Sequence, residues 1–259
     1  MKLCLDVGNS HIYGGVYRSG NVELTFRKSS KMGASSDEYG LFFRSVLREN
    51  NLNPDQISNI ALCSVVPEVV YTLSAACQKY FTTTPFILQA GVKTGLKINY
   101  RNPLEVGTDR IANAMAAVAM FPGENLIVVD LGTATTLCAI SKDHTYRGGV
   151  ILPGMKMSMQ ALDSGTSKLG SVEITRMDTC LGRTTANSIQ SGLYYGNMGA
   201  LQEIMQRIRL EEFDGRRPKV VATGGFATLF GGTGLFDQVV PDLVLRGLLA
   251  ALDLNSPDQ

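Results

Sequence analysis

An apolar segment that ends in an Asp-x-Gly turn occurs twice in this chain, at positions separated by nearly half its length of 259 residues. The first copy runs from Leu3 to Ser10 as LCLDVGNS, and the second from Ile127 to Thr136 as IVVDLGTATT. Asp6 and Asp130 occupy equivalent places in the two copies. Because a repeated supersecondary unit fixes the architecture of a chain, this repeat predicts a fold made of two similar halves.

Strand and helix patterns follow each copy in a similar order. The expected strands cover residues 2–7, 12–17, 22–28, 58–65, 125–130, 134–140, 145–151 and 219–223, with a further extended segment at 85–90. The expected helices cover residues 37–49, a segment opened by Pro67, and residues 108–120, 154–163, 184–209 and 242–252. Three strands followed by alternating helices and strands, twice over, predict an α/β protein with two mixed sheets flanked by helices. We place the halves at residues 1–121 and 122–259 and expect the active site in the cleft between them.

Composition excludes several classes of function. The 24 Lys and Arg residues nearly balance the 23 Asp and Glu residues, so the basic excess of a typical nucleic-acid-binding protein is absent. No apolar run approaches the ~18 residues of a membrane span, and we expect no signal peptide. The five cysteines include no Cys-x-x-Cys pair, which favours a reducing compartment over a zinc site or a disulfide framework. These features predict a cytoplasmic enzyme or binding domain that acts on small molecules.

Each Asp-x-Gly hairpin could bind an anion and a metal ion. Gly8 allows the main chain to approach a ligand closely, and backbone N–H groups beside Asn9 and Ser10 suit phosphate oxygens. The carboxylate of Asp6 suits a hydrated Mg²⁺. The same residues are common in ordinary turns, but a second copy at the equivalent place favours two phosphate loops that face one nucleotide. No Walker-type loop is present, and no G-x-G-x-x-G opens a helix.

A second candidate segment stands directly before the helix expected at 108–120. It places Gly107, Asp109 and Arg110 at an open helix N-terminus, where an alcohol and an anion could be held. In the alternative interpretation Thr108 is the N-cap and Asp109 only complements the helix dipole. An ionised aspartate is a weak base, but phosphoryl transfer depends mainly on positioning, so a weak base suffices.

Six motifs together resemble the type III pantothenate kinases, a family of the actin, Hsp70 and sugar-kinase superfamily. They lie at residues 6–10 (D-x-G-N-S), 100–110 (Y-x-x-P-x-x-x-G-x-D-R), 130–136 (D-x-G-T-A-T-T), 148–154, 185–192 and 223–225. The resemblance implies duplicated ribonuclease H-like (actin-like ATPase) domains. It also implies phosphorylation of pantothenate by ATP, the first step of coenzyme A biosynthesis, with Mg²⁺ and a monovalent cation, K⁺ or NH₄⁺, in a cytoplasmic homodimer.

The resemblance also assigns roles to individual residues. It implies that Asp109 accepts the proton of the pantothenate hydroxyl, that Asp130 binds the monovalent cation, and that Thr133 contacts ATP. The implied first ATP loop consists of Asp6, Val7, Gly8, Asn9, Ser10, His11, Ile12 and Tyr13, with Asp6 near Mg²⁺. The implied substrate-binding residues are Tyr100, Gly107, Thr108, Asp109, Arg110 and Thr185.

Two other functions stay open at this point. One is a non-catalytic nucleotide-binding regulator, because the family carries an older name as an accessory factor for transcription. The presence of Asp6, Asp109 and Asp130 counts against it, since a protein that only binds needs no base. The other is a different small-molecule kinase of the superfamily, acting on a sugar or acetate, against which the segment 100–110 argues.

Overall fold

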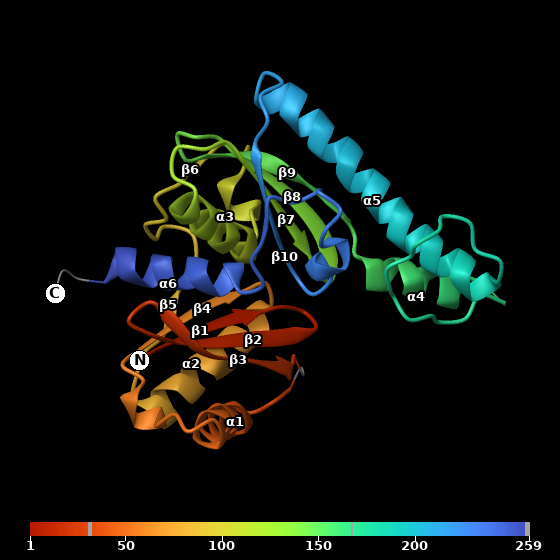
Figure 1. The fold of residues 1–259 in the computed structure, drawn as a ribbon. Coiled ribbons are helices and arrows are strands. Elements are labelled where there is room, and N and C mark those ends of the chain that lie inside the picture. The colour runs from red at the N-terminus through yellow and green to blue at the C-terminus, as the bar shows by residue number, and fades with distance from the viewer. Residues whose placement is uncertain (31–32, 167, 257–259) are drawn as a thin grey trace. The chain divides into compact units, whose positions relative to one another are not determined.

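The computed structural model describes residues 1–30, 33–166 and 168–256, and these divide into two compact units (Figure 1). The first unit holds the described residues of Met1–Gly95, Arg101–Ala116 and Asp242–Gln259, and the second holds those of Leu96–Tyr100 and Ala117–Pro241. Within the described ranges, no helix is both long enough and apolar enough to span a bilayer.

The first unit contains a five-stranded sheet in the order β3-β2-β1-β4-β5. Its strands are β1 (Lys2–Val7), β2 (His11–Arg18), β3 (Asn21–Ser29), β4 (Asn59–Ser64) and β5 (Phe86–Ile87). Its helices are α1 (Ser36–Glu49), α2 (Pro67–Phe81) and α6 (Leu243–Asn255), with short 3-10 turns η1 (Pro54–Gln56) and η2 (Pro103–Glu105). Helix α3 (Thr108–Met120) begins in this unit.

The second unit contains a six-stranded sheet in the order β11-β10-β7-β8-β9-β6. Its strands are β6 (Lys97–Ile98), β7 (Leu126–Leu131), β8 (Ala134–Ile140), β9 (Thr145–Pro153), β10 (Lys219–Thr223) and β11 (Gln238–Val239). Helices α4 (Met155–Gly165) and α5 (Thr185–Glu212) and the 3-10 turn η3 (Ala227–Phe230) complete it. The strands and helices expected from the sequence are confirmed, while the short strands β6 and β11 were not expected.

The strand pairing confirms the duplication that the repeat predicts. Strand β1 pairs antiparallel with β2 and parallel with β4, and β7 pairs in the same way with β8 and β10. The sheet orders then match strand for strand, from β3 and β9 on one side to β5 and β11 on the other. The predicted fold class, two mixed sheets flanked by helices, is therefore confirmed.

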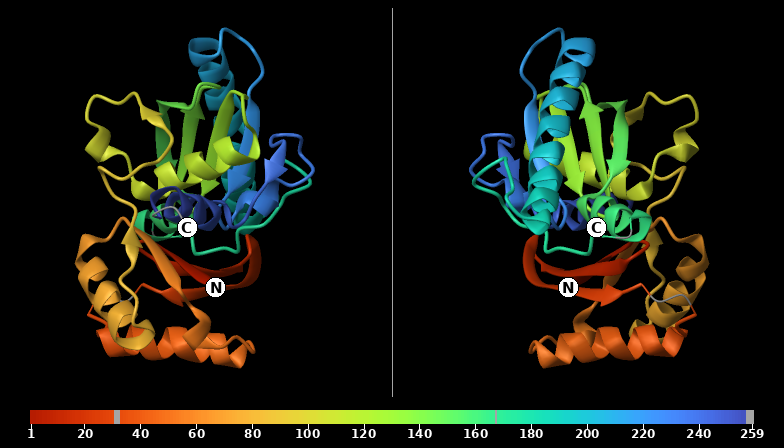
Figure 2. Two further views of the ribbon diagram at one scale, coloured as in Figure 1. Left: turned by 90° about the vertical axis from the view of Figure 1, so that its left-hand side faces the viewer. Right: turned by 90° about the vertical axis from the view of Figure 1, so that its right-hand side faces the viewer.

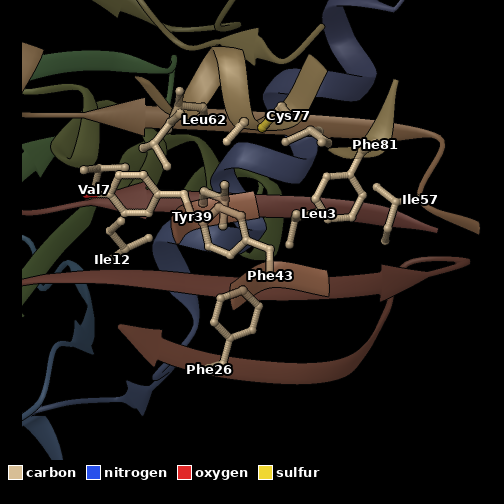
Figure 3. Packing of buried hydrophobic residues seen from close by; sticks show 14 of the residues in the cluster. Leu3, Val7, Ile12, Phe26, Tyr39, Phe43, Ile57, Leu62, Cys77 and Phe81 are labelled. Carbon is tan, nitrogen blue, oxygen red and sulfur yellow. The ribbon is translucent and has the colours of Figure 1, made fainter. Parts of the chain in front are cut away.

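Alternation along β1 decides which side chains enter the core of the first unit. Leu3, Leu5 and Val7 are fully buried and belong to one cluster with residues of α1 and α2, such as Phe43 and Cys77 (Figure 3). Both views in Figure 2 show α1 and α2 on one face of this sheet. Because successive side chains of a strand point to opposite faces, the side chain of Asp6 lies on the other face.

The compact units divide the chain differently from the halves 1–121 and 122–259 at three places, one of which is the end of α3, where residues 117–121 belong to the second unit. Helix α6 belongs to the first unit because it packs on β1 and β4, and Gly247 lies so close to the carbonyl of Ala112 that a side chain there would overlap it. Strand β6 belongs to the second unit because Lys97 and Ile98 pair with β9. The placements of α6 and β6 both arise from contacts between segments far apart in the sequence.

We expect the first unit to lose stability at alkaline pH because it contains buried thiols. Burial raises the pKa of the Cys77 thiol from 9.0 to about 12. The thiol therefore ionises at lower pH in the unfolded chain than in the folded one. The stability that the protonated thiol contributes is full below pH 9 and is lost as pH rises from 9 toward about 12. We expect the free energy of unfolding to fall by about 1.4 kcal/mol per thiol for each pH unit above 9. Urea unfolding of wild type and Cys77→Ala at pH 8 and pH 10.5 checks this; equal pH dependence of the two proteins would contradict it.

Candidate active site

The first Asp-x-Gly hairpin has an ordered base and an exposed tip. Asp6 pairs with Tyr13 across the hairpin, and the N–H of Gly8 donates to the carbonyl of His11 at 3.0 Å. The tip residues Asn9, Ser10 and His11 are exposed. Of the eight residues implied for the first ATP loop, Val7 and Ile12 have fully buried side chains, so they can offer a ligand only main-chain groups.

Asp6 also contacts the neighbouring parallel strand. Cys63 of β4 pairs with Asp6 of β1, and its thiol donates a hydrogen bond to Asp6 Oδ1, with Sγ and Oδ1 3.2 Å apart. Cys63 is fully buried. Sequence reasoning did not single out this cysteine.

The start of α3 holds Asp109 next to the same strand end. The carbonyl of Gly107 accepts from the N–H of Ile111 at 3.1 Å, so Gly107 stands at the N-cap position. The hydroxyl of Thr108, the first helical residue, donates instead to the carbonyl of Ser64 at 3.2 Å. The interpretation of Thr108 as the N-cap is therefore wrong, because Thr108 lies within the helix and its hydroxyl bonds to β4. Asp109 Oδ1 accepts from the N–H of Arg110 at 2.8 Å.

The first unit thus brings the two predicted carboxylates to one place around Cys63. Burial raises the pKa of the Cys63 thiol well above its ordinary value, and the negative charges of Asp6 and, more weakly, Asp109 raise it further. Asp6, the first residue of the predicted phosphate loop, bonds to Cys63, and Asp109, the predicted base, follows the Thr108 that bonds to Ser64, so both lie beside the end of β4.

The second Asp-x-Gly hairpin is enclosed by two glycines of its own unit. The N–H of Gly154 donates to the carbonyl of Thr133 at 3.2 Å, and a side chain on Gly154 would overlap that carbonyl. Gly224 has φ +90°, and a Cβ there would lie 2.5 Å from Asp130 Oδ1. Thr133, at the hairpin tip, is exposed. Only residues without a side chain allow the backbone to approach this loop so closely.

Asp130 repeats the placement of Asp6. Ile127, Val129 and Leu131 belong to the apolar cluster that includes residues of α4 and α5, so the side chain of Asp130 lies on the opposite face of its sheet. In each unit the aspartate therefore lies on the face turned away from the apolar cluster. Each also pairs with the penultimate or last residue of a parallel strand, Cys63 of β4 or Thr223 of β10.

The remaining predicted substrate residues lie in the second unit. Thr185 is exposed at the start of α5 and lines a cavity of about 850 Å³ whose walls come mainly from α4 and α5. Tyr100 follows β6, with its ring centroid 6.4 Å from that of Tyr146. The substrate-binding set is thus divided, with Tyr100 and Thr185 in the second unit and the residues from Gly107 to Arg110 in the first.

Duplicated sheets of this order, each with an Asp-x-Gly hairpin leaving its central strand, define the fold class of actin and the sugar kinases. Solved structures agree: a Sinorhizobium meliloti protein described as a candidate 2-dehydro-3-deoxygalactonokinase has a TM-score of 0.62 at 14% identity, covering 100% of this chain and 98% of its own. A Campylobacter jejuni protein described as a candidate Baf family transcriptional activator has a TM-score of 0.62 at 20% identity, covering 98% of both chains.

The sequence comparisons identify the family within that class. A family model described as type III pantothenate kinase matches residues 2–207. A protein of Legionella pneumophila (strain Corby) named type III pantothenate kinase is 57% identical over 256 residues, which cover 99% of this chain and 100% of that protein. A type III pantothenate kinase of Elusimicrobium minutum is 46% identical over 98% of this chain and 99% of its own. The chain belongs to the type III pantothenate kinase family.

Proposed function

We propose that this protein phosphorylates the primary hydroxyl of pantothenate with ATP, the first step of coenzyme A biosynthesis. Family membership along nearly the whole chain supports the reaction. The observation that supports the mechanism is that Asp6 and the start of the helix of Asp109 both contact the end of β4. In this proposal the carboxylate of Asp6 serves the metal-bound phosphate and that of Asp109 serves the attacking hydroxyl.

In this proposal both hairpins bind the same ATP. The exposed tip from Asn9 to His11 offers main-chain N–H groups and short polar side chains to phosphate oxygens. Thr133 offers the equivalent contact from the second hairpin, whose backbone is held by Gly154. Because phosphoryl transfer needs positioning more than covalent chemistry, fixed loops of this kind supply most of what the reaction requires.

Asp6 fits Mg²⁺ as a single carboxylate ligand. Mg²⁺ commonly keeps several waters and is bound by one or two carboxylates together with substrate phosphates. In the ranges that the structure describes, no cluster of three or more His, Cys, Asp or Glu side chains could hold a metal ion. Asp130 has the same placement in the second unit, and we assign it to the monovalent cation. Bound cations would neutralise charge on the phosphates.

Asp109 is the proposed proton acceptor. One of its oxygens accepts from the N–H of Arg110, and the bond between Thr108 and Ser64 fixes the start of its helix. The carboxylate would orient the pantothenate hydroxyl and take its proton as the bond to phosphorus forms. Tyr100, Gly107, Arg110 and Thr185 complete the proposed substrate-binding set.

The direct test measures phosphopantothenate formed from ATP and pantothenate by the purified protein. We expect product with K⁺ or NH₄⁺ and Mg²⁺ together, and strongly reduced product when either ion is omitted. A panel of sugars and acetate as acceptors serves as the control for specificity. If pantothenate gives no product while another acceptor does, the chain is a different kinase. If ATP binds and no acceptor reacts, it is a regulator.

We further propose that the protein is a cytoplasmic homodimer. All five cysteines are free thiols, as expected in a reducing compartment. The cavity lined by Thr185 is mostly apolar, and the side chain of Met157, which also lines it, is 45% exposed; a second copy would cover such a surface. Sedimentation at micromolar concentration should give the mass of a dimer, and a monomer would contradict this part of the proposal.

A further inference from the structure

We propose that Cys63 is a positioning residue for phosphoryl transfer, whose thiol holds the carboxylate of Asp6 in place by a hydrogen bond to Oδ1. The inference rests on the proposed function only in that Asp6 must take part in binding the metal-bound phosphates of ATP. It assigns a role to a buried cysteine of β4 that the sequence motifs do not include.

The thiol of Cys63 contacts the carboxylate of Asp6 directly. Cys63 and Asp6 are paired residues of two parallel strands, with Sγ 3.2 Å from Oδ1. Cys63 is fully buried, and a buried thiol is a protonated one, which has a hydrogen to donate. An ionised carboxylate only accepts, so the direction of the bond is fixed: the thiol donates and Asp6 accepts.

The end of β4 also supports Asp109. The carbonyl of Ser64, the residue after Cys63, accepts from the hydroxyl of Thr108, and Thr108 directly precedes Asp109. The hydroxyl of Ser64 donates to the carbonyl of Val66 at 2.9 Å and accepts from its N–H at 3.0 Å, which holds the turn after the strand. Two adjacent residues of β4 therefore support both carboxylates, Cys63 through its side chain and Ser64 through its carbonyl.

The second unit repeats the pairing of Cys63 with Asp6. In the second unit, Thr223 of β10 occupies the place of Cys63 and pairs with Asp130 in the same parallel register. Thr223 is 3% exposed. Both halves thus place a short side chain with a polar hydrogen beside the aspartate of the hairpin. A purely apolar side chain at this position would leave Asp6 Oδ1 without the donor that Cys63 supplies.

The test compares two substitutions of Cys63 with a matched control. Cys63→Ala removes the donor, and Cys63→Ser keeps one as a hydroxyl. Cys77→Ala is the control, because Cys77 is also a fully buried free thiol of the first unit, but it lies in the apolar cluster with α1 and α2. We expect Cys63→Ala to weaken Mg²⁺-dependent ATP binding by about fivefold, the effect of one hydrogen bond. Cys63→Ser and Cys77→Ala should stay within about twofold of wild type.

Calorimetric titration of ATP with and without Mg²⁺ gives these affinities without any acceptor, so the result does not depend on pantothenate being the substrate. Infrared difference spectra between wild type and Cys63→Ala would isolate the S–H band of Cys63. A band displaced to the frequency of a hydrogen-bonded thiol, and moved again by Asp6→Asn, supports the contact.

The proposal is overturned if Cys63→Ala binds ATP as tightly as wild type, or if Cys63→Ser loses as much affinity as Cys63→Ala. It is also overturned if Cys77→Ala causes an equal loss, since the effect would then be one of core packing. Failure of the proposed function gives a different result, because in that case neither the wild type nor any Cys63 variant forms phosphopantothenate.

Discussion

Asp109→Asn is expected to lower kcat for pantothenate phosphorylation by about 10²- to 10³-fold, toward the lower part of the range for a general base. Asparagine keeps the size of the side chain and an oxygen that can accept from the N–H of Arg110, the contact that Asp109 makes at 2.8 Å. It cannot take the proton of the attacking hydroxyl. Because the loss falls on the chemical step, KM for pantothenate should change much less than kcat.

Glu105→Gln is the matched control for this substitution. Glu105 is an exposed carboxylate of η2, four residues before Asp109, and its side chain accepts from Asn102 at 3.1 Å. Its neutralisation should leave kcat within about twofold, since an exposed charge contributes little. Steady-state kinetics of both variants separates the roles. An Asp109→Asn enzyme with nearly full kcat would restrict Asp109 to substrate binding.

The sequence repeat, together with the strand and helix patterns that follow each copy, predicted two mixed sheets flanked by helices but not the short strands β6 and β11. The two copies of the Asp-x-Gly hairpin carry strong local signals, an apolar strand followed by turn residues, and β1 and β7 occupy the same place in their sheets. The helices were also predictable, because their apolar periodicity is local. Lys97 and Ile98 form a strand only by pairing with β9, and a two-residue strand has no periodicity to detect.

The site was predictable where its residues lie in motifs and not where it depends on pairing between distant strands. Asp6 and Asp109 stand in motifs of their own, whereas Cys63 gains its place only from the parallel register of β4 with β1. Cys63 and Thr223 occupy equivalent places beside the two hairpin aspartates. Recognising this equivalence requires the register of both sheets, which depends on long-range contacts that spacing along one chain does not determine.

Gly224→Ala is expected to impair the second hairpin through the position of Asp130. Gly224 has φ +90°, a conformation that costs a residue with a side chain about 1–2 kcal/mol. Its new Cβ would also lie 2.5 Å from Asp130 Oδ1 and from the main-chain carbon of Leu131. Either the carboxylate or the backbone of the hairpin must therefore move away from its place.

Gly225→Ala provides a control one residue away. A Cβ added to Gly225 would meet no atom within 4 Å beyond its chain neighbours, and Gly225 has no positive φ, so alanine there should fold and bind ATP nearly as wild type does. We expect Gly224→Ala to lower the thermal midpoint by several degrees, following the strain of about 1–2 kcal/mol. It should also lower kcat/KM for ATP by at least about tenfold, the result of about 1.4 kcal/mol lost in the transition state. Equal kcat/KM values for ATP in the two variants would show that the approach of Gly224 to Asp130 does not matter for ATP. A loss of kcat/KM for ATP in Gly224→Ala alone would tie the close approach of Gly224 to the second hairpin to the nucleotide, because the two substitutions add the same methyl group to adjacent residues but differ in what that group meets and in the positive φ of Gly224.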